Sequence, residues 1–224
     1  MPHLHASFGQ YIQQHLQLTE AQSDALRRRY WLRYGATLLG LVRHHGVEPA
    51  HFLHHTHLLP GLEQRVRGHR ADLAALARLP GRKVILTNAP AAYAARVLGV
   101  LGIGHLFERV LSIEDMHMFG QLRPKPDARM LRWVAARLGV APAQCVLVED
   151  TLAHQKSARR IGMGTVWMQR WLRPAPAAAQ PQPPLPTTGP RPATALRRPA
   201  RRVLAGKPAY VDRRVRRLGQ LLRR

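Results

Sequence analysis

The chain has 224 residues, of which 35 are Lys or Arg and 12 are Asp or Glu, for a formal net charge of +23 at pH 7. This length accommodates one domain of ordinary size plus an additional segment, and no apolar run is long enough to span a bilayer. The single cysteine, Cys145, excludes an internal disulfide framework and is typical of a reducing compartment. We therefore expect a cytoplasmic protein.

The positive charge is concentrated near the end of the sequence, where residues 170–224 carry 14 basic residues and one acid, Asp212. Such a charge attracts polyanions, so this tail offers one route to nucleic acid. A compositional bias toward Arg, Ala and Pro explains the same charge. We favour the compositional explanation, because a basic run alone has poor specificity.

The first 79 residues have the pattern of consecutive helices. Thr19-Glu20-Ala21-Gln22 is a capping-box pattern that opens a helix, and Gly35 is placed to end it. A second helix is predicted through residues 36–45, and Pro49 suits the first turn of a third. Residues 70–79 place apolar side chains at helical spacing. This part of the chain is predicted to be all helix.

Between Lys83 and Met168 the pattern changes to an alternation of strands and helices. Apolar runs without polar alternation indicate strands that are buried on both faces. Strands separated by helices are typical of a doubly wound parallel sheet with a Rossmann-like core. The predicted strands are residues 83–87, 109–113, 145–149 and 165–168, and the predicted helices are residues 90–101, 126–139 and 153–162.

The last part of the chain divides in two. Residues 172–207 are rich in Pro, Ala and Arg and have too few apolar side chains to pack, so this segment is predicted to be disordered. Residues 208–224 regain the pattern of a short strand followed by a helix.

Polar side chains stand where two of the predicted strands end. Thr87 and Asn88 end one strand, Glu149 and Asp150 end another, and Lys125 lies just before a predicted helix. In an open parallel sheet, ligands bind outside the carboxyl ends of the strands. Thr87, Asn88 and Lys125 are therefore expected to bind a phosphoryl group, and the carboxylates suit Mg²⁺, which prefers oxygen ligands. Each element alone has an ordinary structural explanation, and the prediction depends on their order.

This ordered set resembles the haloacid dehalogenase superfamily of phosphohydrolases. "VILTNAP" is similar to its second motif, with Thr87 as the phosphate-binding hydroxyl, and "RPKPD" is similar to its third, with Lys125 as the lysine. "VLVEDTLAHQKSARRIGMGTVWM" is similar to the fourth, which implies Asp150 as a metal ligand with Glu149 beside it. The resemblance covers about residues 7–169.

Within that superfamily, residues 28–63 resemble the helical cap of pyrimidine 5′-nucleotidases. The resemblance implies a cap over residues 1–79, an α/β core over residues 80–171, and a return of residues 208–224 to the core. Because a cap must cover the site, Tyr34, Thr37 and Arg43 are expected to contact the substrate.

The sequence departs from the family pattern at two places. His154 stands where family members often carry an acid or an amide. No Asp-x-Asp-x-Thr segment, which supplies the nucleophile and the general acid in the family, occurs in the 224 residues. The family places that strand between the strands ending at Thr87 and Asp150. We expect that the start codon has been assigned too far downstream, so that the chain lacks about its first 15 to 30 residues. An inactive paralogue is the alternative.

A run of histidines within the predicted cap suggests a different kind of site. His51 and His55 are four residues apart, and imidazoles at that helical spacing can bind zinc. No acid of the HExxH type lies between them, and the resemblance to a cap accounts for the stretch. We therefore do not favour a metal site here. The run comprises His44, His45, His51, His54, His55 and His57.

The sequence as a whole predicts a Mg²⁺-dependent phosphomonoester hydrolase of pyrimidine 5′-nucleotidase type. Its substrate would be a small phosphorylated molecule, a nucleoside monophosphate, attacked to form an aspartyl phosphate on an aspartate that these residues do not contain. Other small phosphate esters such as phosphoglycolate are the alternative substrate class. The alternative functions are an inactive relative and a basic nucleic-acid-binding protein.

Overall fold

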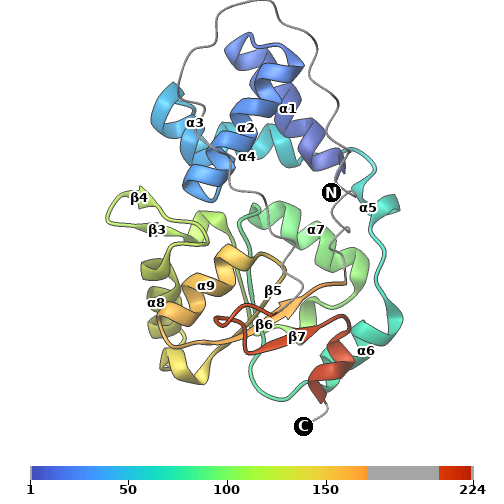
Figure 1. Ribbon diagram of the computed structural model, residues 1–224. Helices are drawn as coiled ribbons and strands as arrows, with labels where there is room; N and C mark the ends of the chain where they lie inside the picture. Colours follow the sequence, from blue (N-terminus) through green and yellow to red (C-terminus); the bar gives the residue numbers. More distant parts are fainter. Residues whose placement is uncertain (1, 171–206, 223–224) are drawn as a thin grey trace, which may run out of the picture.

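The computed structural model describes residues 2–170 and 207–222 and has two layers, a group of helices above an α/β part (Figure 1). The predicted 172–207 segment lies outside the described residues except for Lys207. The helical layer contains α1 (Pro2–Leu16), α2 (Glu20–Tyr34), α3 (Thr37–His45) and α4 (Pro49–His57). The rest contains α5 (Leu62–Arg65), α6 (Arg70–Arg78), β1 (Val84–Leu86), α7 (Ala91–Leu101), η1 (Gly104–Leu106), β2 (Arg109–Leu111), η2 (Ile113–Asp115), β3 (His117–Met118), β4 (Gln121–Leu122), α8 (Ala128–Arg137), η3 (Pro142–Gln144), β5 (Val146–Glu149), α9 (Leu152–Arg160), β6 (Gly164–Met168), β7 (Arg213–Val215) and η4 (Leu218–Leu222).

Local signals in the sequence set the ends of the cap helices. The Thr19 side chain accepts a hydrogen bond from the Gln22 N–H, and the Gln22 side chain accepts one from the Thr19 N–H, so the predicted capping box is confirmed. Gly35 ends α2 at φ +80°, where its N–H donates to the Trp31 carbonyl. Pro49 occupies the first turn of α4, as predicted.

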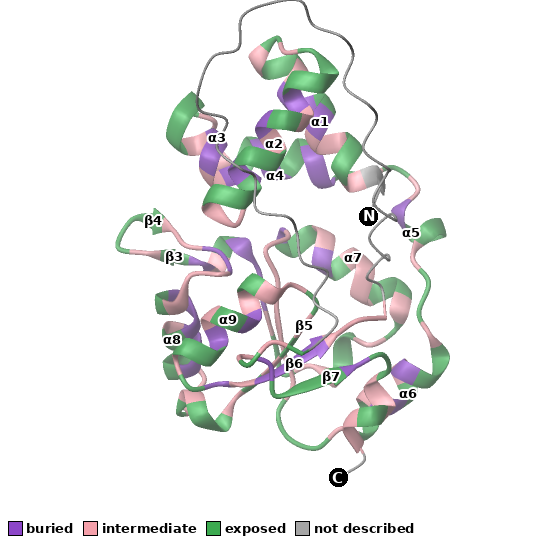
Figure 2. Ribbon diagram, viewed as in Figure 1, coloured by how far each residue is buried: buried purple, intermediate pink, exposed green. Residues whose placement is uncertain are grey.

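Helices α1 to α4 share one hydrophobic core. Tyr11 and Ile12 of α1 pack with Leu41 of α3 and Phe52 of α4, and all four are buried. Figure 2 marks buried stretches of the cap helices in purple. Ile113 from the α/β part belongs to the same cluster, so the cap is packed onto the layer below it. These contacts make α1–α4 one compact cap.

Two groups of parallel strands form the α/β part. β1 pairs with β2, and β5, β6 and β7 pair in that order. A second hydrophobic core lies between these strands and helices α8 and α9, where Met130, Leu131 and Ala158 are fully buried. Parallel strands that alternate with helices confirm the predicted α/β fold.

The two parallel groups are separate sheets. Among the described residues, the edge of β1 opposite β2 and the edge of β5 opposite β6 carry no strand. Val146 and Val148 of β5 are 62% and 41% exposed, although strands of this composition are normally covered on both faces. Both edges therefore leave backbone groups available for pairing.

The helices that pack together as a cap end before residue 79, the boundary that was expected from the sequence. Helix α5 contacts α7, and α6 contacts η4 near the end of the chain. The Leu218 N–H donates to the Asp72 carboxylate at 2.8 Å, which ties η4 to α6. Helices α5 and α6 therefore pack with the α/β part, and the cap cluster ends at α4.

The short antiparallel pair β3–β4 is an element that the sequence pattern did not predict. Its turn has positive φ angles at Phe119 (+52°) and Gly120 (+71°), and Phe119 is 95% exposed. The pair lies beneath α3 in Figure 1. None of the helices among residues 2–170 and 207–222 is both long and apolar enough to cross a bilayer.

A buried histidine of the cap gives a testable pH dependence. Burial lowers the pKa of His57 from 6.5 to about 4. Above pH 6.5 the imidazole is neutral in both folded and unfolded states, and as the pH falls from 6.5 to 4 only the unfolded state takes up the proton. The free energy of unfolding should therefore drop by about 3 kcal/mol over this range.

The measurement is urea unfolding between pH 4 and 7 of the wild-type protein and of His57→Phe, which keeps a ring of similar size. The His57→Phe profile should be flatter than the wild-type profile by that amount. His54→Phe, at an exposed position of the same helix, should retain the wild-type slope. Equal slopes for all three proteins would contradict the assignment.

Candidate active site at the carboxyl ends of the strands

Thr87 lies directly after β1. Its N–H donates to the Leu111 carbonyl at 2.9 Å, which continues the β1–β2 ladder by one residue. Its Oγ1 accepts a hydrogen bond from the Ala89 N–H at 3.0 Å. Among the described residues no acceptor is assigned to the Thr87 hydroxyl proton, which is therefore available to an external oxygen.

Asn88 joins the loop after β1 to the loop that carries Lys125. The Asn88 Nδ2 donates to the Lys125 carbonyl at 2.9 Å, and the Lys125 N–H donates to the Asn88 Oδ1 at 3.0 Å. Both ends of the amide are therefore engaged with one backbone unit. Asn88, predicted to bind phosphate, holds Lys125 in this structure.

The Lys125 ammonium forms an ion pair with Glu149 at the end of β5. Nζ lies 2.6 Å from the Glu149 Oε2, and the two side chains are only 10% and 11% exposed. Lys125 thus connects three loops, through Asn88 at its backbone and Glu149 at its ammonium. The structure brings Thr87, Lys125 and Glu149 to one edge of the α/β part.

Several groups hold the Glu149 carboxylate. Besides Lys125, it receives hydrogen bonds from the N–H groups of Asp150 (3.0 Å) and Thr151 (3.2 Å), and His154 Nδ1 lies 3.1 Å from Oε2. Burial works against ionisation, but the contacts with His154, Asp150 and Lys125 outweigh it and hold the pKa of Glu149 well below its usual range. Glu149 is ionised and fully occupied by the protein.

Asp150 has a more open carboxylate. It is an exposed residue, its Oδ1 accepts from the Thr151 hydroxyl at 3.2 Å, and its backbone carbonyl accepts from the Trp167 indole at 2.9 Å. The neighbouring Glu149 carboxyl raises the pKa of Asp150 to about 6. A cation beside Asp150 would relieve this repulsion.

This donor set fits Mg²⁺ in part. Asp150 offers the hard oxygen ligand that Mg²⁺ prefers, whereas the Glu149 carboxylate is taken up by Lys125 and His154. No cluster of three or more His, Cys, Asp or Glu side chains suited to a metal ion occurs in the part of the chain that the structure describes. Asp150 would hold the ion when it is bound, with other ligands from water and substrate.

The cap approaches the site through the turn between α2 and α3. A Cβ placed on Gly35 would lie 2.4 Å from the Pro126 Cδ, so only glycine allows this approach. The contact sets the residues next to Gly35 close to the loop that carries Lys125. Figure 1 shows this turn region of the cap facing the α/β layer.

The predicted substrate-contacting residues of the cap occupy different environments. The Tyr34 hydroxyl and the His44 Nε2 are hydrogen-bonded at 2.5 Å. Thr37 is 6% exposed, and its hydroxyl donates to the Arg27 carbonyl at 3.4 Å inside the cap. Arg43 is exposed on α3. Tyr34, beside Gly35, is therefore the one whose position near the site follows from the contacts.

Three histidines of the cap, His15, His51 and His55, lie beside Tyr11. The rings of His51 and His55 are 4.3 Å apart, and those of His15 and His51 are 5.1 Å apart. The Tyr11 hydroxyl and the His51 Nδ1 are hydrogen-bonded at 2.8 Å. These contacts hold His15, His51 and His55 together beside Tyr11.

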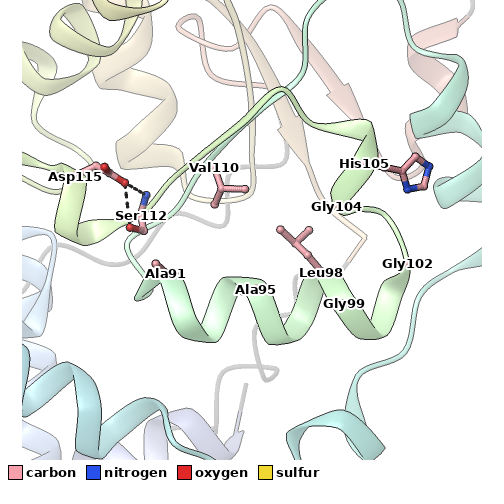
Figure 3. Close-up of a pocket in the computed structure, with 10 residues that line it drawn as sticks. All are labelled: Ala91, Ala95, Leu98, Gly99, Gly102, Gly104, His105, Val110, Ser112 and Asp115. Carbon is pink, nitrogen blue, oxygen red and sulfur yellow. Dashed lines mark hydrogen bonds between the residues drawn. The ribbon is translucent and has the colours of Figure 1, made fainter.

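A hollow of about 510 Å³ lies between α7 and β2 (Figure 3). The Asp115 carboxylate in its wall accepts hydrogen bonds from the N–H and the hydroxyl of Ser112. Thr87, Lys125 and Asp150 are not among its lining residues, which are Ala91, Ala95, Leu98, Gly99, Gly102, Gly104, His105, Val110, Ser112 and Asp115. We therefore place the candidate site at the strand ends.

Comparison with known proteins gives matches to phosphatases. A stretch of 80 residues is 35% identical to fructose-1-phosphate phosphatase YqaB of Escherichia coli. A stretch of 99 residues is 32% identical to phosphoserine phosphatase of Thermus thermophilus. The matches cover 36% and 43% of this chain and 40% and 37% of those proteins. The chain thus spans about two fifths of the length of these curated relatives.

Solved structures share the fold at low sequence identity. A HAD phosphatase from Thermococcus onnurineus superposes with a TM-score of 0.51 at 16% identity, covering 97% of this chain and 86% of that one. The putative HAD-hydrolase YfnB from Bacillus subtilis gives a TM-score of 0.53 at 14% identity, covering 97% and 89%. Residues 11–162 match the family described as haloacid dehalogenase-like hydrolase. The chain belongs to the haloacid dehalogenase-like hydrolase family.

Proposed function

We propose that this protein is a Mg²⁺-dependent phosphomonoester hydrolase that acts on nucleoside monophosphates. The observation that supports it most is the link from Asn88, next to Thr87, through Lys125 to Glu149, the neighbour of Asp150, at one edge of the α/β part. The Thr87 hydroxyl would donate to a phosphoryl oxygen. Lys125, held by Asn88 and Glu149, would offset the negative charge that gathers on the phosphoryl group.

The proposal places one more strand between β1 and β5. Both have a free edge in the described structure, and the resemblance to the family sets a strand that ends in Asp-x-Asp-x-Thr at this position. Its first aspartate would attack phosphorus, the ester oxygen would leave with a proton from the second, and water would then hydrolyse the aspartyl phosphate. Bound Mg²⁺ would supply positive charge that offsets the negative phosphoryl oxygens. Asp150 would anchor that ion.

The substrate class is tested with a panel of phosphate esters. Uridine monophosphate, fructose 1-phosphate, phosphoserine and phosphoglycolate would be assayed for phosphate release, with Mg²⁺ and with EDTA, in a protein that carries the additional strand. Fructose 1-phosphate and phosphoserine are included because two relatives of this chain are named as phosphatases of these compounds. Preference for the nucleotide supports the proposal, and preference for any of the other three overturns the nucleotidase assignment.

Asp150→Asn is expected to weaken Mg²⁺ binding to this chain on the order of tenfold or more, because the substitution removes the anionic ligand. The readout is isothermal titration with MgCl₂ at pH 7.5, which does not depend on turnover. Asp24→Asn, an equal change of charge on a half-exposed side chain of the cap, should leave the affinity unchanged. Equal affinities for wild type and Asp150→Asn would remove Asp150 from the metal site.

A further inference from the structure

The linker between α4 and α5 connects the cap to the α/β part in an unusual backbone conformation. Leu59 has φ +35° and Gly61 has φ +69°. Glycine adopts positive φ freely, but a leucine does so at a cost and persists there only when its surroundings hold it. The linker therefore needs an external restraint at Leu59.

Arg96 of α7 supplies that restraint. Its Nε lies 2.6 Å from the Glu63 Oε1 and its Nη2 lies 3.1 Å from Oε2, a two-point ion pair just beyond the linker. Its Nη1 donates to the Leu58 carbonyl and its Nη2 to the Leu59 carbonyl at 3.3 Å. One guanidinium thus holds both the strained backbone and the helix that follows it.

The same face of α7 also meets the end of the cap. Tyr93 lies three residues before Arg96, and its ring contacts that of buried His57 edge to face at 5.4 Å. Helix α7 begins soon after Thr87 and Asn88, so it extends from the candidate site to the linker. Helix α7 therefore contacts the end of the cap and also begins next to the strand end that carries Thr87.

We propose that the Arg96–Glu63 pair is a latch that sets the orientation of the cap over the candidate site. The Arg96 side chain is 32% exposed and that of Glu63 is 50% exposed, and exposed ion pairs are weak enough to break in ordinary thermal motion. Release of the guanidinium leaves Leu59 free to return to negative φ, which turns the cap about the linker. The inference concerns the cap alone and does not depend on the proposed function.

Distance measurement between spin labels on the cap and on the α/β part tests the latch. Labels are placed at Gln14→Cys in α1 and Lys156→Cys in α9, both exposed positions, in a Cys145→Ser background. The protein with intact Arg96 should give one narrow distance distribution. Arg96→Ala should add a second, displaced population.

Arg82→Ala is a matched control. Arg82 forms a two-point ion pair with Glu108 at 2.7 Å through each of two nitrogens and donates to the Leu138 carbonyl at 2.8 Å, but it touches no part of the linker. Its substitution should leave the distance distribution narrow. A second population in both variants would show general loosening, and none in Arg96→Ala would show that the cap is held elsewhere; either result overturns the latch.

Glu63→Gln supplies a milder variant should Arg96→Ala fail to fold. It keeps the contacts of Arg96 with the two carbonyls and removes only the charge of the partner. The second population is expected here too, with smaller amplitude. A distribution identical to that of the unsubstituted protein overturns the role of the ion pair.

Discussion

Replacing Lys125 by alanine is expected to lower kcat/KM for phosphomonoester hydrolysis by about a hundredfold to a thousandfold, as is common for single electrostatic groups in an active site. The ammonium would offset the charge of the phosphoryl oxygens and of the attacking carboxylate, which otherwise repel each other. Its place is held at two points, by Asn88 at the backbone and Glu149 at Nζ. A group that is positioned in advance stabilises the transition state without reorganisation.

The measurement requires a protein that also carries the proposed Asp-x-Asp-x-Thr strand, assayed for phosphate release from a nucleoside monophosphate. Lys156→Ala is the matched control, because it removes the same charge from an exposed position of α9. It should retain nearly all activity. If both variants lose activity equally, general electrostatics rather than the position of Lys125 explains the effect.

The elements that the sequence predicts well are those set by local chemistry. The capping box at Thr19 and the left-handed glycine at Gly35 involve residues within one turn of the helix that they bound. The strands from Val84 and Val146 follow from short apolar runs. In each case the side chains that determine the element are neighbours in sequence.

The β3–β4 pair was not predicted, because the sequence of its turn is not one that favours a two-residue hairpin turn. Turns of two residues with positive φ favour Asn or Asp followed by Gly, whereas Phe119 precedes Gly120 here. A bulky residue with φ +52° is rare in any sequence pattern. Only the surrounding structure places it there.

Roles within the candidate site required coordinates, because they depend on residues far apart in the chain. The order of motifs was enough to identify Thr87, Lys125 and Asp150 as candidates. Asn88 and Lys125, however, are 37 residues apart, and no local pattern predicts that the Asn88 amide hydrogen-bonds to both the N–H and the carbonyl of Lys125. Glu149 and Asp150 are adjacent and chemically similar. Their separation into a partner of Lys125 and an open carboxylate arises from contacts with His154 and Lys125.

The ion pair of Lys125 and Glu149 should also be visible in stability. Glu149→Leu is expected to lower the free energy of unfolding by about 3 to 5 kcal/mol, because it leaves the ammonium buried without a partner. The measurement is guanidinium unfolding at pH 7. Glu108→Leu, which breaks the exposed pair with Arg82, should cost no more than about 1 kcal/mol.

The double variant Lys125→Met/Glu149→Leu tests whether the fold itself requires this ion pair. With both charges gone, apolar side chains of similar volume fill the space, so most of the loss in Glu149→Leu should be regained. A double variant as unstable as Glu149→Leu would mean that the carboxylate site matters through the N–H groups of Asp150 and Thr151 rather than through Lys125. Recovery would instead show that the fold does not need this pair. An ion pair that the fold can replace with apolar side chains, at an edge that also presents the Thr87 hydroxyl and the Asp150 carboxylate, is then best explained by a ligand that requires the ammonium.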